Sequence, residues 1–447
     1  MKSRVIDNPN PNATLGFVLF YPFHFYVYKN VYKNIKYKSE FIVDLGRFYP
    51  FADQQVNLLT NIIKLLNKHE ANYRIIYYED YTKEDYLKMF FSKYYGLVSL
   101  MERGCLLLSC NRNKRKIHMN YGAGKELTML RPSMRFYDLA LAYGKRAHKH
   151  LSLYTYCKIV GNPKFDDWFA NELDKELSAD LTSKIESNKK TLLYLPTHGD
   201  LTSMDALALP LQHLSKIYNV VVKLHYYNVY EERERVSKFE GNNIILYDDS
   251  ADLLPLLKIA DVVICDNSSA IFDAILADKP VVVADLLSQD YIDFEHKKPA
   301  ALRGRISTAL TYSGSIEQLI KKNKLVVTVS SPSQLADAIK IALDDKAFFK
   351  DARETLRKEL FAFRDKYCGK RAASSIEELM IMKKMRQKTP LAQALDAAEQ
   401  LQKNNSQHFM PMSQWLRSEN IKINKKIYLF VLKVLEEIFN RKLYIKN

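Results

Sequence analysis

The sequence is poor in glycine, and this scarcity limits the nucleotide sites that it can form. Only 13 of the 447 residues are glycine. The G-x-G in MNYGAGKE (119–126) lacks the third glycine of a dinucleotide fingerprint and lies late in its domain, not after the first strand. GAGKEL also lacks the GKS/T ending of a Walker A loop. These absences argue against a nicotinamide site and against a P-loop.

Paired cysteines and long apolar runs are also missing. The five cysteines form no CxxC pair or ligand cluster, and their odd number indicates a reducing compartment without disulfides or structural zinc: Cys105, Cys110, Cys157, Cys265 and Cys368. No stretch reaches the roughly 18 to 20 apolar residues of a membrane span. The apolar run near the start is interrupted by Pro22 and His24, so it resembles a first strand more than a signal peptide. We expect a cytoplasmic protein.

Positive charge is abundant. The formal net charge is +16 and the pI is near 9.3, which indicates a polyanionic partner such as nucleic acid, an anionic membrane or a phosphate-rich substrate. The basic residues are dispersed, with short runs at 112–116, 383–388 and 422–426, and a solvated face is the simplest interpretation of each run. No RRM, helix-turn-helix, zinc or KH signature occurs. A basic nucleic-acid-binding protein is the non-enzyme alternative, but no nucleic-acid partner is expected.

The order of apolar runs and helical patterns indicates an α/β fold. In the first half, β-branched and aromatic runs alternate with a helix-like segment at 54–69. In the second half, five such runs begin near residues 191, 219, 242, 261 and 279 and are separated by helix-length segments. We predict two Rossmann-like domains facing a cleft: an acceptor-side domain at 1–160 and a nucleotide-donor domain at 161–370, followed by a basic helical extension at 371–447.

The end of the extension has an apolar face. Ile427, Val431, Val434 and Ile438 lie on one side of the predicted helix, with lysines around them. Docking against the protein body is the simpler interpretation. The alternative is peripheral contact with an anionic membrane, at the inner face of the cell membrane.

Four polar residues follow a buried run in ADVVICDNSSAIFDAILADKPVVVAD (260–285). Asp266, Asn267, Ser268 and Ser269 stand where a strand passes into a helix. Asp, Asn and Ser are good N-cap residues, so capping alone could explain them. A helix start at the carboxyl end of a parallel strand is also an anion site. The two interpretations are compatible.

Three other polar stretches also follow predicted strands: NYGAGK (120–125), LPTHGD (195–200) and KLHYYN (223–228). With CDNSSAIFD (265–273), in this order and spacing, they resemble the CDP-glycerol glycerophosphotransferase family of GT-B type enzymes, which build teichoic-acid-like and capsular polyol phosphate polymers. GNPKFD (161–166) is similar to the crossover motif of that family. The resemblance covers about residues 115–290.

The sequence departs from the family pattern at several positions. Tyr121 stands where the family has its first histidine, Lys223 replaces an arginine, Tyr226 a proline and Asn267 a tyrosine. His225 and the Asp-Ser-Ser core are retained. These changes predict a divergent member.

The candidate residues divide into two groups. Lys223 and His225 share a face of their strand and could neutralise the leaving phosphate, while His198 is a candidate base for the acceptor hydroxyl and His118 a weaker one. The catalytic candidates are His225, His198 and Tyr121. The candidates for binding the donor or its phosphates are Gly122, Gly124, Lys125, Thr197, Lys223, Asp266, Asn267, Ser268, Ser269 and Asp273. No metal and no cofactor are expected.

Each assignment has a simpler structural alternative. His225 could be a satisfied structural histidine, the glycines could form a plain tight turn, and Asp273 could be an acid favoured by the helix dipole. The predicted function is transfer of a polyol phosphate from a CDP-activated donor to a cell-surface polysaccharide or lipid-linked acceptor. A GT-B glycosyltransferase or an epimerase that uses a nucleotide sugar is the alternative among enzymes.

Overall fold

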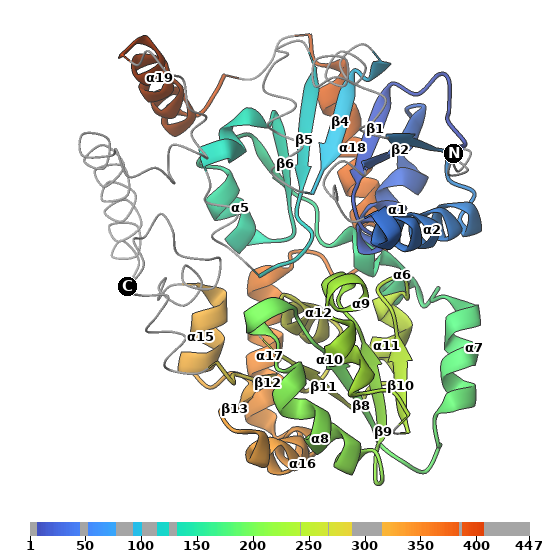
Figure 1. Cartoon of the computed structure of the whole chain (residues 1–447). Helices are drawn as coiled ribbons and strands as arrows, with labels where there is room; N and C mark the ends of the chain where they lie inside the picture. The colour runs from blue at the N-terminus through green and yellow to red at the C-terminus, as the bar shows by residue number, and fades with distance from the viewer. Residues whose placement is uncertain are drawn as a thin grey trace.

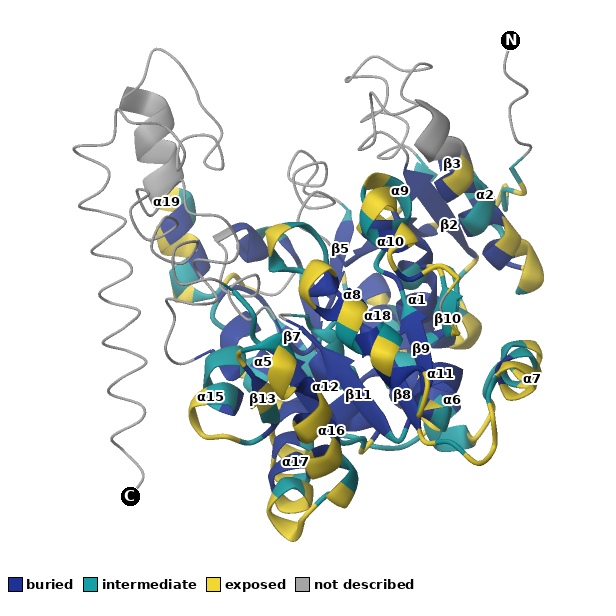
Figure 2. Ribbon diagram, turned by 60° about the horizontal axis from the view of Figure 1, so that its bottom comes forward, coloured by how far each residue is buried: buried dark blue, intermediate teal, exposed yellow. Residues whose placement is uncertain are grey.

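The computed structural model describes residues 7–44, 52–76, 93–100, 114–124, 132–241, 243–266, 268–287, 315–383 and 387–405. Its strands form two fully parallel sheets, one in each of two lobes (Figure 1). Most strand residues of both sheets are buried, and the exposed residues gather on the outer sides of the helices (Figure 2). The predicted α/β fold with two Rossmann-like units is confirmed.

The first sheet has the order β3-β2-β1-β4-β5-β6-β7. Its strands are short and mostly buried, as expected for parallel strands covered on both faces, and two of them include buried charged residues. They are β1 (Leu15–Leu19), β2 (Ser39–Asp44), β3 (Tyr73–Ile76), β4 (Gly96–Ser99), β5 (Arg115–Met119), β6 (Leu139–Ala142) and β7 (Cys157–Ile159).

The second sheet has the order β10-β9-β8-β11-β12-β13. The strand order reverses between β8 and β11, so the crevice at their carboxyl ends is the switch point where ligands bind in such sheets. The strands are β8 (Thr191–Leu195), β9 (Asn219–Lys223), β10 (Ile244–Tyr247), β11 (Val262–Cys265), β12 (Val281–Ala284) and β13 (Val327–Val329).

Helices cover both faces of each sheet. Those in or next to the first lobe are α1 (Pro22–Asn34), α2 (Ala52–Lys68), α5 (Lys145–Leu151), α18 (Cys368–Ile381) and α19 (Pro390–Asn405), with the short helix η3 (Pro132–Phe136). The second lobe follows the junction helices η4 (Pro163–Phe165) and α6 (Asp166–Ala170). Its helices are α7 (Lys175–Lys184), η5 (Gly199–Leu201), α8 (Met204–Leu214), α9 (Tyr226–Glu231), α10 (Arg233–Ser237), α11 (Leu253–Ile259), α12 (Ala270–Leu276), α15 (Ile316–Lys322), η6 (Pro332–Gln334), α16 (Leu335–Asp344) and α17 (Ala347–Leu360).

The chain returns to the first lobe near its end. Helix α17 lies in the second lobe, whereas α18 lies beside β4 and β1 in the first (Figure 1). Ala372, Ile376 and Leu379 of α18 are buried in the core of the first sheet. The position predicted for the end of the second domain, residue 370, falls inside α18.

The junction between the lobes is built from GNPKFD. Gly161 has φ +84, and an added Cβ would meet Cys368 Sγ at 2.4 Å, so a larger residue would fit neither the backbone nor the space. The Asp166 carboxylate accepts the amide protons of Cys368 (2.9 Å) and Gly369 (2.7 Å). Burial raises the pKa of Asp166 to about 6. The crossover segment therefore also fixes the start of α18.

One of the basic runs is not a solvated face. Arg115 and Lys116 belong to β5 and are buried. Arg115 Nε donates to the carbonyl oxygen of Leu379 at 3.2 Å, and its guanidinium also bonds that of Met382, so it caps the end of α18. The interpretation of 112–116 as a solvated run is therefore wrong for these two residues. The predicted amphipathic helix near the C-terminus lies outside the described residues.

Candidate functional site

The candidate residues of the second lobe lie at the switch point of its sheet. Thr197 and His198 follow β8, His225 follows β9, and Asp266 and Ser268 follow β11. Because the three strands are adjacent and parallel, their carboxyl ends meet at one edge. The fold thus brings three of the four predicted motifs together.

Asp266 is fully buried and holds the loop after β8. Its carboxylate accepts the amide proton of Thr197 at 2.8 and 3.0 Å, and bonds the amide (3.1 Å) and hydroxyl (3.3 Å) of Ser203. Burial raises the pKa of Asp266 to about 7, although these hydrogen bonds oppose the shift. All four contacts are internal, so Asp266 organises the loop that carries His198.

His198 and His225 stack on each other. Their ring centroids are 4.3 Å apart and the planes differ by 18°. Tyr227 covers His198 at 4.5 Å and 9°. Stacking of this kind favours one relative orientation of the rings. The two histidines predicted from separate motifs therefore form one unit.

The hydrogen bonds of His225 determine which nitrogen can act. His225 is the N-cap of α9, and its Nδ1 accepts the amide proton of Tyr227 at 3.3 Å. In the neutral ring the proton must then reside on Nε2. Nε2 is therefore the atom that can donate a hydrogen bond or proton to a ligand.

Aromatic rings from the first lobe extend the stack. Tyr226 packs on Tyr21 with a centroid distance of 3.7 Å and an interplanar angle of 26°. Phe23 lies 6.1 Å from both Tyr226 and Tyr121. Tyr121 follows β5, so the strand-end loops of both sheets meet in this aromatic cluster, which comprises Tyr21, Phe23, Tyr121, His198, His225, Tyr226 and Tyr227.

The glycine turn of the first lobe reaches the start of α12. A Cβ added to Gly122 would lie 3.1 Å from Ser269 Cβ, and one on Gly124 would lie 2.7 Å from the Phe272 ring. Only glycine allows this approach without displacing a neighbour. The loop at 120–124 and the start of α12 were predicted to line opposite sides of the same cleft, and the structure places them in contact.

The partly buried Lys223 and the buried Asp249 lie side by side next to the cluster. Lys223 Nζ donates to the backbone carbonyl oxygen of Asp249 at 3.4 Å, and Tyr230 Oη donates to Asp249 Oδ1 at 3.2 Å. Burial lowers the pKa of Lys223, and Asp249 and Asp248 oppose that shift. Burial raises the pKa of Asp249 to about 6, while Lys223 opposes it. The ammonium predicted to meet a phosphate thus lies next to a carboxylate.

Asp273 is joined to the junction motif. Its Oδ2 lies 2.6 Å from Lys164 Nζ, and both side chains are mostly buried. Lys164 belongs to the crossover stretch GNPKFD. The ion pair links the crossover segment to the first turn of α12, close to Ser269.

The remaining candidates are placed as follows. The Ser268 hydroxyl accepts the amide proton of Ala270 at 3.2 Å, as a capping residue does. His118 is buried, bonds Asn120 Oδ1 at 3.1 Å, and has its pKa lowered to about 4 by burial. Lys125 and Asn267 lie outside the described residues.

Two residues that contact the candidate residues were not identified from the sequence. Asn228 is fully buried and bonds both strand-end loops. The sequence feature that could have indicated Asn228 is the spacing H-x-x-N at a helix start, which is a capping-box pattern with unusual residue types. Lys164 was visible only within the crossover motif, which was interpreted as a domain junction.

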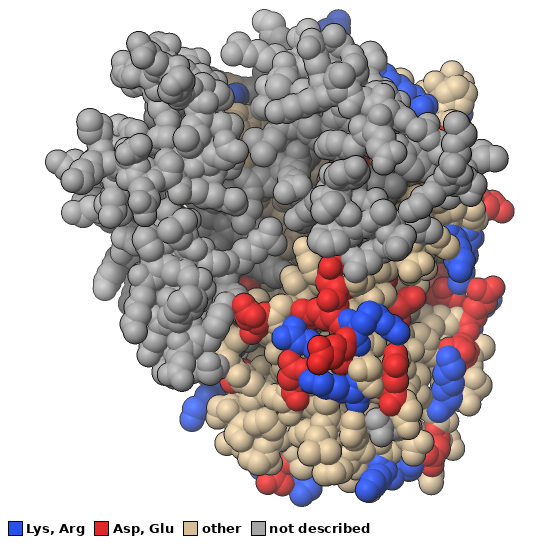
Figure 3. All heavy atoms as spheres, in the orientation of Figure 1, with Lys and Arg blue, Asp and Glu red and all other residues tan. Residues whose placement is uncertain are grey.

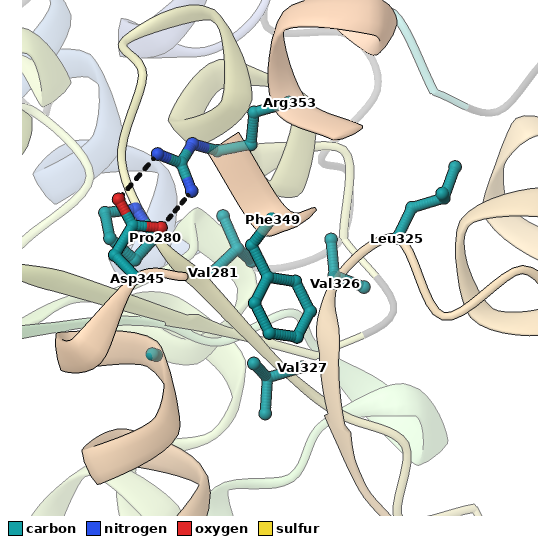
Figure 4. A pocket seen from close by; sticks show the side chains of 9 residues that line it. Pro280, Val281, Leu325, Val326, Val327, Asp345, Phe349 and Arg353 are labelled. Carbon is teal, nitrogen blue, oxygen red and sulfur yellow. Dashed lines mark hydrogen bonds and ion pairs between the residues drawn. The ribbon is translucent and has the colours of Figure 1, made fainter. Parts of the chain in front are cut away.

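A small cavity lies far from this site. It is lined by residues at the amino ends of β12 and β13 and by α17, among them Pro280, Val281, Val326 and Phe349 (Figure 4). Arg353 there forms a double hydrogen bond with Asp345 at 2.6 and 2.9 Å. This cavity is at the opposite edge of the sheet from the switch point, and its charged groups satisfy each other.

Charges on the visible face of the second lobe are mixed. Acidic and basic side chains alternate there without forming a basic stripe (Figure 3). Within the described ranges, no group of three or more His, Cys, Asp or Glu side chains is arranged to hold a metal ion. None of the helices described has the length and apolarity needed to cross a membrane.

Comparison with known proteins extends the motif resemblance. The family model described as CDP-Glycerol:Poly(glycerophosphate) glycerophosphotransferase matches residues 147–300. The teichoic acid ribitol-phosphate primase of Bacillus spizizenii is 32% identical over 131 residues, covering 27% of this chain and 33% of the primase. The chain therefore spans about a third of the length of that curated relative.

Solved structures of the wall teichoic acid polymerase TagF share the fold. One matches with a TM-score of 0.53 and 15% identity, covering 83% of this chain and 90% of the other. A variant of the same polymerase soaked with CDPG matches with a TM-score of 0.55 and 15% identity, covering 83% and 89% of the two chains. The resemblance inferred from the motifs is thus confirmed: residues 147–300 are similar to the CDP-glycerol:poly(glycerophosphate) glycerophosphotransferase family, and the chain shares the two-sheet fold of TagF.

Proposed function

We propose that this protein transfers a polyol phosphate, such as glycerol phosphate, from a CDP-activated donor to a hydroxyl of a growing polymer or lipid-linked acceptor. The observation that carries the proposal is the stacked pair of His198 and His225 at the switch point. The matched family region, 147–300, contains both histidines. The glycine turn of the first lobe faces the same edge.

The proposed step is a displacement at phosphorus. The acceptor hydroxyl oxygen attacks the phosphorus that carries the polyol, and the bond from that phosphorus to the bridging oxygen breaks. CMP leaves with the bridging oxygen, and the acceptor becomes a phosphodiester. His198 takes the hydroxyl proton, and His225 Nε2–H supplies a hydrogen bond or proton to the departing oxygen.

The other donor contacts come from the elements around the pair. Ser268 and Ser269 offer hydroxyls at the start of α12, and Lys223 lies at the end of β9. Thr197 and Asp266 maintain the loop beneath His198. Gly122 and Gly124 let the first lobe close against α12. Lys125, Asn267 and Asp273 remain proposed contacts of the donor, and Tyr121 a proposed contact of the acceptor.

The proposed acceptor implies that the reaction takes place at a membrane surface. A lipid-linked or cell-surface polymer grows at the inner face of the cell membrane, and a chain of net charge +16 is attracted to an anionic surface. Sedimentation with vesicles containing an anionic lipid should therefore recover the protein at low salt and release it at high salt.

The proposal is tested by incubating the protein with matched donors and measuring the released nucleotide. CDP-glycerol and CDP-ribitol should release CMP in the presence of a polyol phosphate oligomer. UDP-glucose should release no UDP. Release of UDP with transfer of sugar, and none of CMP, would show a glycosyltransferase instead.

A further inference from the structure

We propose that Asn228 is a positioning residue, which sets the relative placement of His198 and His225. The inference rests on the proposed function, because it concerns the two histidines assigned there. Asn228 lies in the first turn of α9 and is fully buried. It is the last residue of the KLHYYN stretch, in which the sequence pattern assigned a role only to Lys223 and His225.

The amide of Asn228 joins the two histidine loops. Its Oδ1 accepts the backbone amide proton of His225 at 2.9 Å. Its Nδ2 donates to the carbonyl oxygen of Thr197, directly before His198, at 3.1 Å. The second Nδ2 proton goes to Glu232 Oε2 at 2.6 Å. One buried side chain therefore holds the backbone of both loops.

The Thr197 peptide groups are fixed from two directions. Asp266 accepts the Thr197 amide proton, and Asn228 binds the Thr197 carbonyl oxygen. Glu232 also accepts the Gly199 amide proton at 2.8 Å, so the residue after His198 is held as well. The backbone on both sides of His198 is thus bound by buried or mostly buried polar groups.

This arrangement matters because proton transfer needs close geometry. A catalytic base or acid acts within hydrogen-bond reach, about 2.6 to 3.2 Å, of its partner. A shift of about 1 Å can reduce the rate by about 100-fold. If Asn228 no longer joins the loops, the rings at 4.3 Å can separate while the donor site stays in place.

Asn228→Asp removes the two hydrogen-bond donors of the Asn228 amide with little change in the shape of the side chain. The carboxylate keeps an oxygen for the His225 amide, but it presents a second oxygen to Thr197 O and the Glu232 carboxylate, where repulsion replaces two hydrogen bonds. We expect kcat for CMP release to fall by about 30-fold or more, with KM for the CDP donor changed by less than about 3-fold.

A matched control lies at the other end of β9. Asn219 is also buried, and its Nδ2 donates to the carbonyl oxygens of Glu186 (2.9 Å) and Lys189 (3.1 Å). Asn219→Asp should lower the melting temperature similarly but leave kcat within about twofold, because it is remote from the histidines. Equal losses of kcat in both variants would overturn the positioning role.

A readout independent of activity separates this proposal from the function on which it rests. Histidine-labelled protein should show a nuclear Overhauser contact between the rings of His198 and His225, weakened in Asn228→Asp and retained in Asn219→Asp. A protein that uses no CDP donor but shows this pattern would refute only the proposed function. Retention of the contact in Asn228→Asp would refute the positioning role. If Asn228→Asp does not fold, Asn228→Ser, which is too short to reach Thr197 O, takes its place.

Discussion

At the scale of single residues, His225 combines a proposed catalytic role with the role of N-cap of α9. Its Nδ1 accepts the Tyr227 amide proton, so the proton of the neutral ring resides on Nε2. His225→Ala should therefore lower kcat by about 100-fold or more, because stabilisation of charge on the departing phosphate is lost. The measurement is steady-state CMP release beside thermal unfolding. Near-normal turnover by a folded variant would make His225 a structural residue.

Substitution of Ser269 should weaken nucleotide binding without lowering kcat. Its side chain stands at the start of α12, where Gly122 approaches it. Ser269→Ala removes one donor, which should weaken nucleotide binding by about 1 to 2 kcal/mol while kcat is retained. Calorimetric titration with CMP provides the measurement. Ser331→Ala, at the capping residue of η6, is the control and should leave affinity unchanged.

Asp266 should make stability depend on pH. Burial raises its pKa to about 7 in the folded protein, above the value near 4 of an unfolded chain. At a pH between these two pKa values, Asp266 is protonated in the folded state and ionised in the unfolded state. The stability that this proton contributes is therefore lost as the pH rises from about 4 to about 7.

The comparison with Asp266→Asn isolates this effect. The difference in unfolding free energy between wild type and variant should change by up to about 1.4 kcal/mol per pH unit inside that window and be flat above it. Chemical denaturation at several pH values measures the difference. A constant difference from pH 4 to 7 would show that the carboxylate is already ionised at the lower limit.

At the scale of elements, the sequence was most informative in the second lobe. Its β-branched runs between helix-length segments correspond to β8, β9, β10, β11 and β12. Two strands, β7 and β13, have only three residues each, which is too short for a periodic pattern. Helix α1 begins at Pro22 and carries aromatic residues on all sides, because it is buried between the two lobes. Its burial removes the polar face by which a helix is recognised.

The site was predictable where it depends on strand ends and not where it depends on contacts between loops. His198, His225 and Ser269 follow strands, and parallel strands that are neighbours bring such residues together. The stack of the two imidazoles, the linkage through Asn228 and the pair of Lys164 with Asp273 arise from loops distant in sequence. No local pattern encodes these distances.

Arg115 should be essential for the docking of α18. Its side chain binds the last carbonyl groups of that helix from β5. Arg115→Met keeps much of the apolar volume but removes the guanidinium donor from both carbonyl groups, of which that of Leu379 still accepts the Met382 amide proton, so the free energy of unfolding should fall by about 2 kcal/mol. Lys340→Met, which breaks an exposed ion pair with Asp337, should change it by less than about 1 kcal/mol. Equal effects of the two variants in urea denaturation would contradict the docking role.

At the scale of the whole molecule, α1 connects the lobes. Tyr26 Oη donates to the carbonyl oxygen of Ser250 at 2.7 Å, Lys29 pairs with Asp167, and Asn30 Nδ2 donates to Pro163 O at 3.0 Å. Tyr21, directly before the helix, stacks on Tyr226 of the second lobe. One buried helix and the aromatic cluster thus join the two lobes, in addition to the contact of the glycine turn with α12.

A double-mutant cycle measures this contact between the lobes. Tyr21→Leu and Tyr226→Leu should show a coupling energy of about 0.5 to 1.5 kcal/mol, the usual value for a stacked aromatic pair. Phe348 and Tyr21, which lie in different lobes and share no ring contact, form the control cycle and should give about zero. Zero coupling between Tyr21 and Tyr226 would mean that the lobes do not meet through these rings in solution.

The return of α18 to the first lobe determines the order in which a nascent chain can complete its fold. Met380 packs against Gly96, where an added Cβ would meet its sulfur at 2.6 Å. On the ribosome, the strands from β1 to β7 emerge long before Met380 is translated. An apolar face of the first lobe therefore stays uncovered until the second lobe has been synthesised. The first lobe begins to fold first during translation, but its fold is completed only after α18 has been made.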